Sequence, residues 1–152
     1  QLTSAVGGII FADFAYPRTP KIEKLHADGL LPEGMFLCVT DTRGSHSELT
    51  GEFAAIRREM EAVAACLGQN VLGRVPETAF WQALPRLRTQ CGDRAVLRAI
   101  HYYQENARAL AQKNALQRGD FAEFLHLIRA NGHSSFAYCQ NCLLYTSPSP
   151  RD

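Results

Sequence analysis

The feature that most constrains this chain is a long stretch of apolar residues at helical spacing, from about Thr50 to Asn131. Residues three and four positions apart share one side of an α-helix, and the spacing therefore predicts a helix over about 50–67, stopped at Gly68. Its apolar face would carry Phe53, Ile56, Met60, Val63 and Leu67. The charge run at Arg57, Arg58, Glu59 and Glu61 is typical of a solvated face with local ion pairs.

Three more helices are predicted further along the chain. Pro76 suits the first turn of a short helix. Asp93 can cap a long helix that ends at Gly119. Residues 120–123 (Asp-Phe-Ala-Glu) have the form of a capping box and open a last helix, which residues 131–132 (Asn-Gly) would close.

The first part of the chain has a different pattern. Gly7 and Gly8 separate the end of a helix from a predicted strand over about 9–14, and a second short strand fits 21–25. The best strand candidate is MFLCVTDT, residues 35–42, which Gly residues flank. Strands first and helices after predict an α+β fold and not a doubly wound sheet.

Length and charge exclude some classes of partner. The chain has 152 residues and a net charge of +1, from 16 basic and 15 acidic side chains. This balance gives no electrostatic footprint for nucleic acid or an anionic membrane. No apolar run approaches the ~20 residues that span a bilayer. Because the chain begins with Gln1 and has no signal-peptide pattern, we expect a piece of a longer protein.

The cysteine pattern predicts free thiols. Five cysteines at irregular spacing argue against a disulfide framework. Cys38 and Cys66 lie in apolar surroundings, which favours small core residues in a reducing cytosol. Cys139-Gln-Asn-Cys142 is formally a CxxC motif. Zinc binding or redox chemistry would need a second ligand pair or a thioredoxin-like context, and the alternative is that the spacing has no chemical role.

A few polar clusters are candidate sites. His46, beside Ser45 and Asp41, either faces a ligand or forms a turn whose side chains bond the local backbone. Residues 101–103 (His-Tyr-Tyr) lie within the long helix, and one or two of them should face the core. In residues 133–135 (His-Ser-Ser), neighbouring His and Ser make no nucleophile–base pair without suitable geometry. No phosphate loop, HExxH or GxSxG motif is present.

Three stretches together resemble bacterial galactokinases, sugar kinases of the GHMP superfamily. They are QLTSAVGGIIFADF, LCVTDTRGSHSELTGEFAAIRREMEAV, and the run from CGDRAVLRAIHYYQEN to SSFAYCQN. The most specific parts are residues 98–101 with Glu105, and residues 131–136. In the second of these, Gly132 and Phe136 depart slightly from the family's pattern.

The resemblance covers about residues 1–141. It implies a fragment of a GHMP kinase fold, with 1–46 ending the N-terminal domain and 47–141 forming a helical segment that leads into the C-terminal domain. It also implies a cytoplasmic parent enzyme that uses ATP and Mg²⁺ to phosphorylate the anomeric hydroxyl of galactose. The family's phosphate loop and catalytic Asp would lie upstream. We therefore expect an inactive fragment that binds neither ATP nor Mg²⁺, and we assign it no catalytic or metal residue.

The resemblance assigns two substrate-binding residues. Gln1 matches the Gln of the family's Met-Asp-Gln motif. Phe53 stands where galactokinases carry a Tyr whose hydroxyl reaches the sugar. Losing a partner for a buried polar group costs about 1–3 kcal/mol, so the alternative substrate is another sugar or sugar derivative. Phe53 could instead be the first core residue of its helix. The rival function is a non-catalytic helical interaction module.

The last segment, CLLYTSPSPRD at residues 142–152, has no apolar period. One set of codons that encodes this segment looks like the DNA sequence of a transposase sequencing adapter, translated in frame. We therefore expect a non-native tail, which would remove Cys142 and the CxxC motif from consideration. The alternative is a natural Ser/Pro-rich tail, disordered or in polyproline II conformation.

Overall fold

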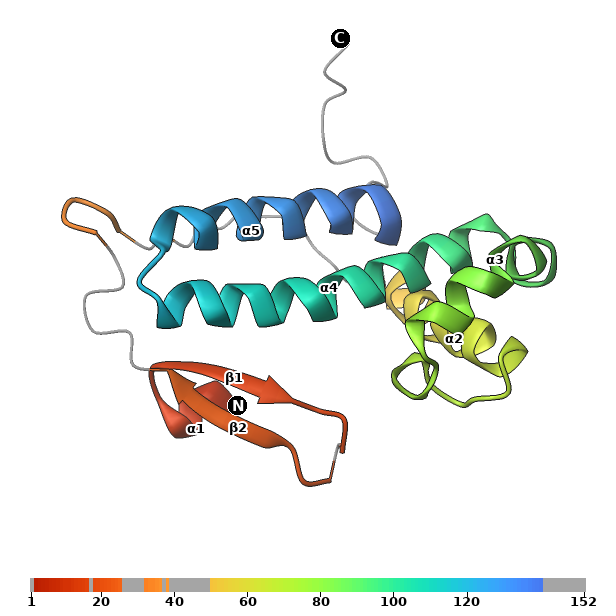
Figure 1. Cartoon of the computed structure of the whole chain (residues 1–152), viewed down its shortest axis with the longest axis horizontal. Helices are drawn as coiled ribbons and strands as arrows, with labels where there is room; N and C mark the ends of the chain where they lie inside the picture. Colours follow the sequence, from red (N-terminus) through yellow and green to blue (C-terminus); the bar gives the residue numbers. More distant parts are fainter. Residues whose placement is uncertain (1, 17, 26–31, 37, 39–49, 141–152) are drawn as a thin grey trace, which may run out of the picture. The chain divides into compact units, whose positions relative to one another are not determined.

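The computed structural model describes residues 2–16, 18–25, 32–36, 38 and 50–140 (Figure 1). In chain order its elements are α1 (Leu2–Val6), β1 (Ile9–Asp13), β2 (Lys21–Leu25), α2 (Thr50–Cys66), a 3₁₀ turn (Leu72–Arg74), α3 (Glu77–Cys91), α4 (Asp93–Gln117), α5 (Phe121–Ser134) and a π-helical turn (Ser135–Cys139). Helices dominate and two strands form the sheet, which agrees with the predicted α+β class.

The chain divides into two compact units. The first, which we call the hairpin unit, comprises Gln1–Thr40 and Ala107–Arg129. The second, the helical unit, comprises Asp41–Asn106 and Ala130–Asp152. The helices α4 and α5 therefore contribute residues to both units. None of the helices among the described residues combines the length and apolar character that crossing a membrane requires.

The hairpin unit begins as the sequence predicts, with a short helix, a glycine turn and two strands. β1 and β2 pair antiparallel, with Ile9 opposite Leu25 and Asp13 opposite Lys21. Gly7 and Gly8 both have positive φ angles, 72° and 74°, which glycine adopts without steric cost. A lone two-stranded hairpin is marginal in water, so this one depends on further packing.

That packing comes from the C-terminal part of α4. The Glu23 carboxylate of β2 accepts a hydrogen bond from the Gln117 side-chain amide at 2.8 Å and pairs with the Lys113 ammonium. The same ammonium lies 4.9 Å from the centre of the Phe11 ring, a cation–π contact. One lysine thus holds both strands of the hairpin against the helix.

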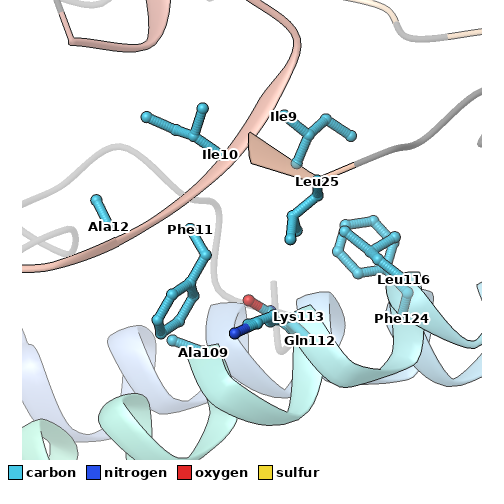
Figure 2. A pocket seen from close by; sticks show the side chains of 10 residues that line it. All are labelled: Ile9, Ile10, Phe11, Ala12, Leu25, Ala109, Gln112, Lys113, Leu116 and Phe124. Carbon is cyan, nitrogen blue, oxygen red and sulfur yellow. The ribbon is translucent and has the colours of Figure 1, made fainter. Parts of the chain in front are cut away.

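A hollow of about 290 Å³ lies between the hairpin and the helices of this unit (Figure 2). Phe11 and Leu25 point into it from the strands, and Phe124 lines it from α5. Its walls are mostly apolar, and the Lys113 amine at its edge already pairs with Glu23. Sugar sites need several converging polar groups, so we interpret this hollow as a packing surface.

The helical unit contains the hydrophobic core. Phe80 is fully buried and its ring lies 5.1 Å from that of Tyr103. The buried residues of this core come from α2, the 3₁₀ turn, α3 and α4: Val63, Ala64, Leu72, Val75, Phe80, Leu87, Ala95, Val96, Ala99 and Tyr103. The helical spacing read from the sequence is confirmed here. α2 ends before Gly68, whose φ of 74° is the left-handed conformation expected at a helix end.

The strand predicted at residues 35–42 is not observed where the structure describes it. Met35, Phe36 and Cys38 lie outside any strand, and the rest of the segment is outside the described residues. Phe36 is 85% exposed, and Cys38 is exposed rather than a core residue. A strand needs a neighbour to satisfy its backbone groups, and in the described sheet β1 and β2 pair only with each other.

The predicted end of the last helix is also wrong. α5 continues through Asn131 and Gly132 to Ser134, and a π-helical turn follows. The start was predicted correctly, since the Asp120 carboxylate accepts a hydrogen bond from the Glu123 backbone N–H at 3.0 Å. A mid-helix glycine costs about 1 kcal/mol, and contacts to α4 described below outweigh that local preference.

Candidate functional site

The two predicted substrate-binding residues differ in what the structure shows. Gln1 lies outside the described residues, as does the turn with Asp41, Ser45 and His46. Phe53 lies in the first turn of α2, and its side chain is 45% exposed. Phe53 is therefore not a buried core residue of its helix.

The most buried charged group in the described structure is Arg98 of α4, which is 0% exposed. Its Nε donates a hydrogen bond to the Cys139 carbonyl at 3.0 Å, and its Nη1 donates to Glu59 Oε2 at 2.8 Å. Its Nη2 lies 3.5 Å from Glu52 Oε2. Burying a charge is costly unless it is paired and hydrogen-bonded. This guanidinium donates two hydrogen bonds, and a second carboxylate lies at ion-pair distance from Nη2.

Arg94, one turn earlier on α4, shares the same carboxylates. Its Nε donates to Glu59 Oε1 at 3.0 Å, and its Nη1 lies 3.6 Å from Glu52 Oε2. The hydrogen bond that Arg94 donates to Glu59 raises the pKa of Arg94 above its ordinary value, with a further contribution from the charge of Glu59. We call Arg94, Arg98, Glu52, Glu59 and the Cys139 carbonyl the Arg98 network.

This network fixes the beginning of α2. Glu52, which is bound to both arginines, immediately precedes Phe53. Glu59 lies two turns further along the same helix. Two carboxylates on one helix therefore hold the segment that carries Phe53 against α4. Such anchoring is what an aromatic side chain needs if it is to meet a ligand at a defined position.

A second polar cluster lies further along α4. His101 Nδ1 is 2.9 Å from Ser134 Oγ and 3.8 Å from Glu105 Oε1. The Asn131 amide donates to the other oxygen of Glu105. We call His101, Glu105, Asn131 and Ser134 the His101 cluster. It joins α4 to the end of α5, which explains why that helix continues past Gly132.

The His101 cluster lacks the geometry of a nucleophile–base–acid triad. In such a triad the two ring nitrogens have separate roles, one facing the nucleophile and the other the orienting carboxylate. Here Nδ1 faces both Ser134 and Glu105. Ser134 is 4% exposed, so a substrate would not reach its hydroxyl. The neighbouring His133 is exposed and does not contribute. We interpret the cluster as a structural link that positions the two helices.

Sequence reasoning missed the Arg98 network. The sequence predicts a solvated charge run that includes Glu59. This prediction is wrong for Glu59, which pairs with the buried Arg98. It is confirmed for Arg57 and Glu61, which form an exposed i,i+4 pair at 2.8 Å. The signal was present, because Glu59 falls in helical line with Ala55 and Val63, both buried. A carboxylate on the buried side of a helix requires a buried cation.

No group of three or more metal-ligating side chains occurs among the described residues. The two polar clusters place arginine, histidine and carboxylate groups mainly against one another. Their chemistry is that of positioning.

The chain is similar to curated galactokinases. It is 35% identical over 108 residues to the galactokinase of Streptomyces coelicolor, covering 70% of this chain and 27% of that protein. It is 30% identical over 105 residues to galactokinases of Glaesserella parasuis and Actinobacillus pleuropneumoniae, covering 69% of this chain and 27% of each. The chain is galactokinase-like.

The galactokinase-like chain spans about a quarter of the length of these relatives, 27%. No protein-family model matches it, and no solved structure matches it significantly. The GHMP kinase fold and the division at residue 46 therefore stay predictions from the resemblance. The two segments in which that resemblance is most specific, 98–105 and 131–136, supply all four members of the His101 cluster and Arg98 itself.

Proposed function

We propose that this galactokinase-like chain is part of an ATP-dependent sugar kinase that transfers the γ-phosphate of ATP to the anomeric hydroxyl of galactose. The observation that carries the proposal is its similarity to three galactokinases over about 70% of its length, at 30–35% identity. The buried polar clusters support it, since they occupy the segments that most resemble the family.

Within this kinase, we propose that the described segment helps to position the sugar. Phe53 would present its half-exposed ring to the sugar, and the Arg98 network would hold the helix that carries it. A phenylalanine ring offers apolar contact but no hydroxyl. The proposal therefore includes an alternative substrate, a sugar or sugar derivative that does not use the tyrosine hydroxyl.

We further propose that the 152-residue chain alone does not transfer phosphate. Phosphoryl transfer depends on a phosphate cradle, metal ions and a positioned nucleophile. We expect, from the resemblance alone, that the phosphate loop and the catalytic Asp would lie upstream of Gln1. ATP and Mg²⁺ would bind the parent enzyme, whose partners would be ATP and a small sugar and whose location would be the cytoplasm. Gln1 stays a proposed contact near the catalytic Asp.

The experiment has two stages. A long read of the source DNA gives the reading frame on both sides of residues 1–141 and shows whether the codons of residues 142–152 belong to it. The complete protein is then assayed for ADP formation with galactose, glucose, galactosamine and no sugar. We expect galactose-dependent ADP formation by the complete protein and none by the 152-residue chain. A complete protein that phosphorylates none of these sugars would contradict the kinase proposal and favour the non-catalytic interaction module.

Phe53 is tested in the complete enzyme by Phe53→Tyr, with Phe53→Leu as the matched control that removes the ring. A restored hydrogen bond of about 1–3 kcal/mol should lower the KM for galactose by about 5- to 150-fold. Phe53→Leu should raise KM. An unchanged KM in both variants would remove Phe53 from the site while leaving the kinase assignment in place.

A further inference from the structure

Two cysteines that the proposed function does not use lie in contact through their sulfur atoms. Cys66 is the last residue of α2 and Cys91 is the last residue of α3. Their Sγ atoms are 3.1 Å apart, and both side chains are partly buried free thiols. We propose that Cys66 and Cys91 are a redox modification site that closes to a reversible disulfide in the presence of a low-molecular-weight disulfide such as oxidised glutathione.

The geometry needs little rearrangement. A disulfide bond is about 2.05 Å long, so the two sulfur atoms must approach by about 1 Å. Both cysteines end their helices, and Gly68 and Gly92, with φ angles of 74° and 83°, follow within two residues. The chain leaves the helices at these points, which is where a small backbone shift is easiest.

The other two cysteines among the described residues provide a contrast. Cys38 is exposed and belongs to the hairpin unit. Cys139 is buried in the π-helical turn, and its backbone carbonyl accepts a hydrogen bond from Arg98. Among the described residues, only Cys66 and Cys91 have their sulfur atoms recorded in contact. A disulfide formed in the folded chain should therefore be selective for this pair.

The reaction balances as two thiol–disulfide exchanges. The Cys66 thiolate attacks one sulfur of oxidised glutathione, forming a mixed disulfide and releasing one glutathione thiolate. Cys91 then loses its proton and attacks Cys66 Sγ, forming the protein disulfide and releasing the second glutathione. The two protein thiols are oxidised, the glutathione disulfide is reduced, and the two thiol protons pass to solvent or to the released glutathione.

The order of the steps follows from the environment of Cys91. Burial, with the hydrogen bond to Cys66 as the next contribution, raises the pKa of Cys91 to about 11. A thiol is a nucleophile only as its thiolate, so Cys91 should react slowly with an oxidant by itself. Its attack on Cys66 is favoured by proximity, and the contribution of Cys66 to the raised pKa ends once Cys66 is in a mixed disulfide.

The disulfide would tie the end of α2 to the end of α3 around the core residues Phe80 and Leu87. A crosslink of this loop size restricts the unfolded chain and should raise the unfolding temperature by about 5–15 °C. Reduction should restore the original value. The expected effect is thus a reversible stiffening of the helical unit.

The test uses the complete 152-residue chain with all five cysteines. Reduced protein is incubated with oxidised glutathione, free thiols are alkylated, and peptides are mapped by mass spectrometry, once in native buffer and once in denaturant. We expect the Cys66–Cys91 linkage to dominate in native buffer and random linkages in denaturant. The same distribution in both conditions, which an unfolded chain would also give, would overturn the proposal.

Single variants test the order of the steps. Cys91→Ala should trap glutathione on Cys66, whereas Cys66→Ala should leave Cys91 largely unmodified while the exposed Cys38 reacts. Cys38→Ala is the matched control and should form the Cys66–Cys91 linkage like the parent chain. If incubation with oxidised glutathione modifies Cys38 but leaves Cys66 and Cys91 of the parent chain as free thiols that are then alkylated, the pair is not a redox site.

Discussion

Replacing Arg98 by methionine should destabilise the helical unit more than replacing any exposed arginine. Arg98 is 0% exposed and donates to Glu59 and to the Cys139 carbonyl, at 2.8 and 3.0 Å. Methionine keeps much of the volume but removes both bonds. Removing one partner of a buried ion pair costs about 3–5 kcal/mol. Glu59 keeps its hydrogen bonds to Arg94, and its side chain is 21% exposed to solvent. We therefore expect the free energy of unfolding to fall by about 3 kcal/mol, near the lower limit of this range.

The assay is urea unfolding followed by the fluorescence of Trp81, the only tryptophan in the chain. Trp81 lies on α3 in the helical unit, and its ring is 5.2 Å from that of Phe80, so it reports on the core of this unit. With a slope of about 2 kcal/mol per molar urea, Arg98→Met should lower the unfolding midpoint by about 1.5 M. The slope should not change.

Two variants make this prediction refutable. Arg57→Met removes an exposed arginine whose partner, Glu61, lies on the same helix, and it should leave the midpoint unchanged. Arg98→Lys keeps the charge but loses the planar fork that reaches a carbonyl and a carboxylate together, so most of the destabilisation should remain. A midpoint for Arg98→Met equal to that of Arg57→Met would refute the reasoning, as would a fully stable Arg98→Lys.

Two further predictions concern Tyr103 and Lys113. Burial raises the pKa of Tyr103 to about 12, whereas an unfolded chain loses this proton near pH 10, so the neutral phenol stabilises the fold below about pH 10 and this contribution is lost as pH rises through about 12. Tyr103→Phe should reduce the loss of stability between about pH 9 and 11, measured by urea unfolding at both values. At neutral pH it should lower the free energy of unfolding by about 1 kcal/mol, because the hydrogen bond to the Val75 carbonyl is lost. An unchanged loss of stability between these pH values would contradict the prediction. Lys113→Met should speed hydrogen exchange of the β1 and β2 amides, because one ammonium contacts both Glu23 and Phe11. Lys21→Met, which removes an exposed lysine at the start of β2, is the control, and equal exchange in both variants would show that Lys113 does not hold the hairpin.

The helices could be predicted from the sequence because their signals are local. Apolar spacing and terminal residues such as Gly68 and Asp120 decide where they run and end. The prediction failed at Asn131 and Gly132, where the local signal says stop. The Asn131 amide instead binds Glu105, 26 residues away, and the helix continues. Tertiary contacts of this kind leave no periodic trace in a single sequence.

The Arg98 network was missed for a similar reason. Arg98 and Glu59 are 39 residues apart, and neither position shows its partner. What the sequence did offer was a polar residue on an apolar face, since Ala55, Glu59 and Val63 form one line along α2. The general rule is that a charge in such a line predicts a buried partner on another helix.

The departures from the family's pattern fit this account. Arg98, His101, Glu105, Asn131 and Ser134 lie in the segments that most resemble galactokinases, and they bind one another or the backbone. The hydrogen bonds of a buried polar network strengthen one another, so its residues are constrained as a set. Gly132 and Phe136, which differ from the pattern, are both exposed, Phe136 at 55%. Substitutions at these two exposed positions should therefore leave the contacts between α4 and α5 intact.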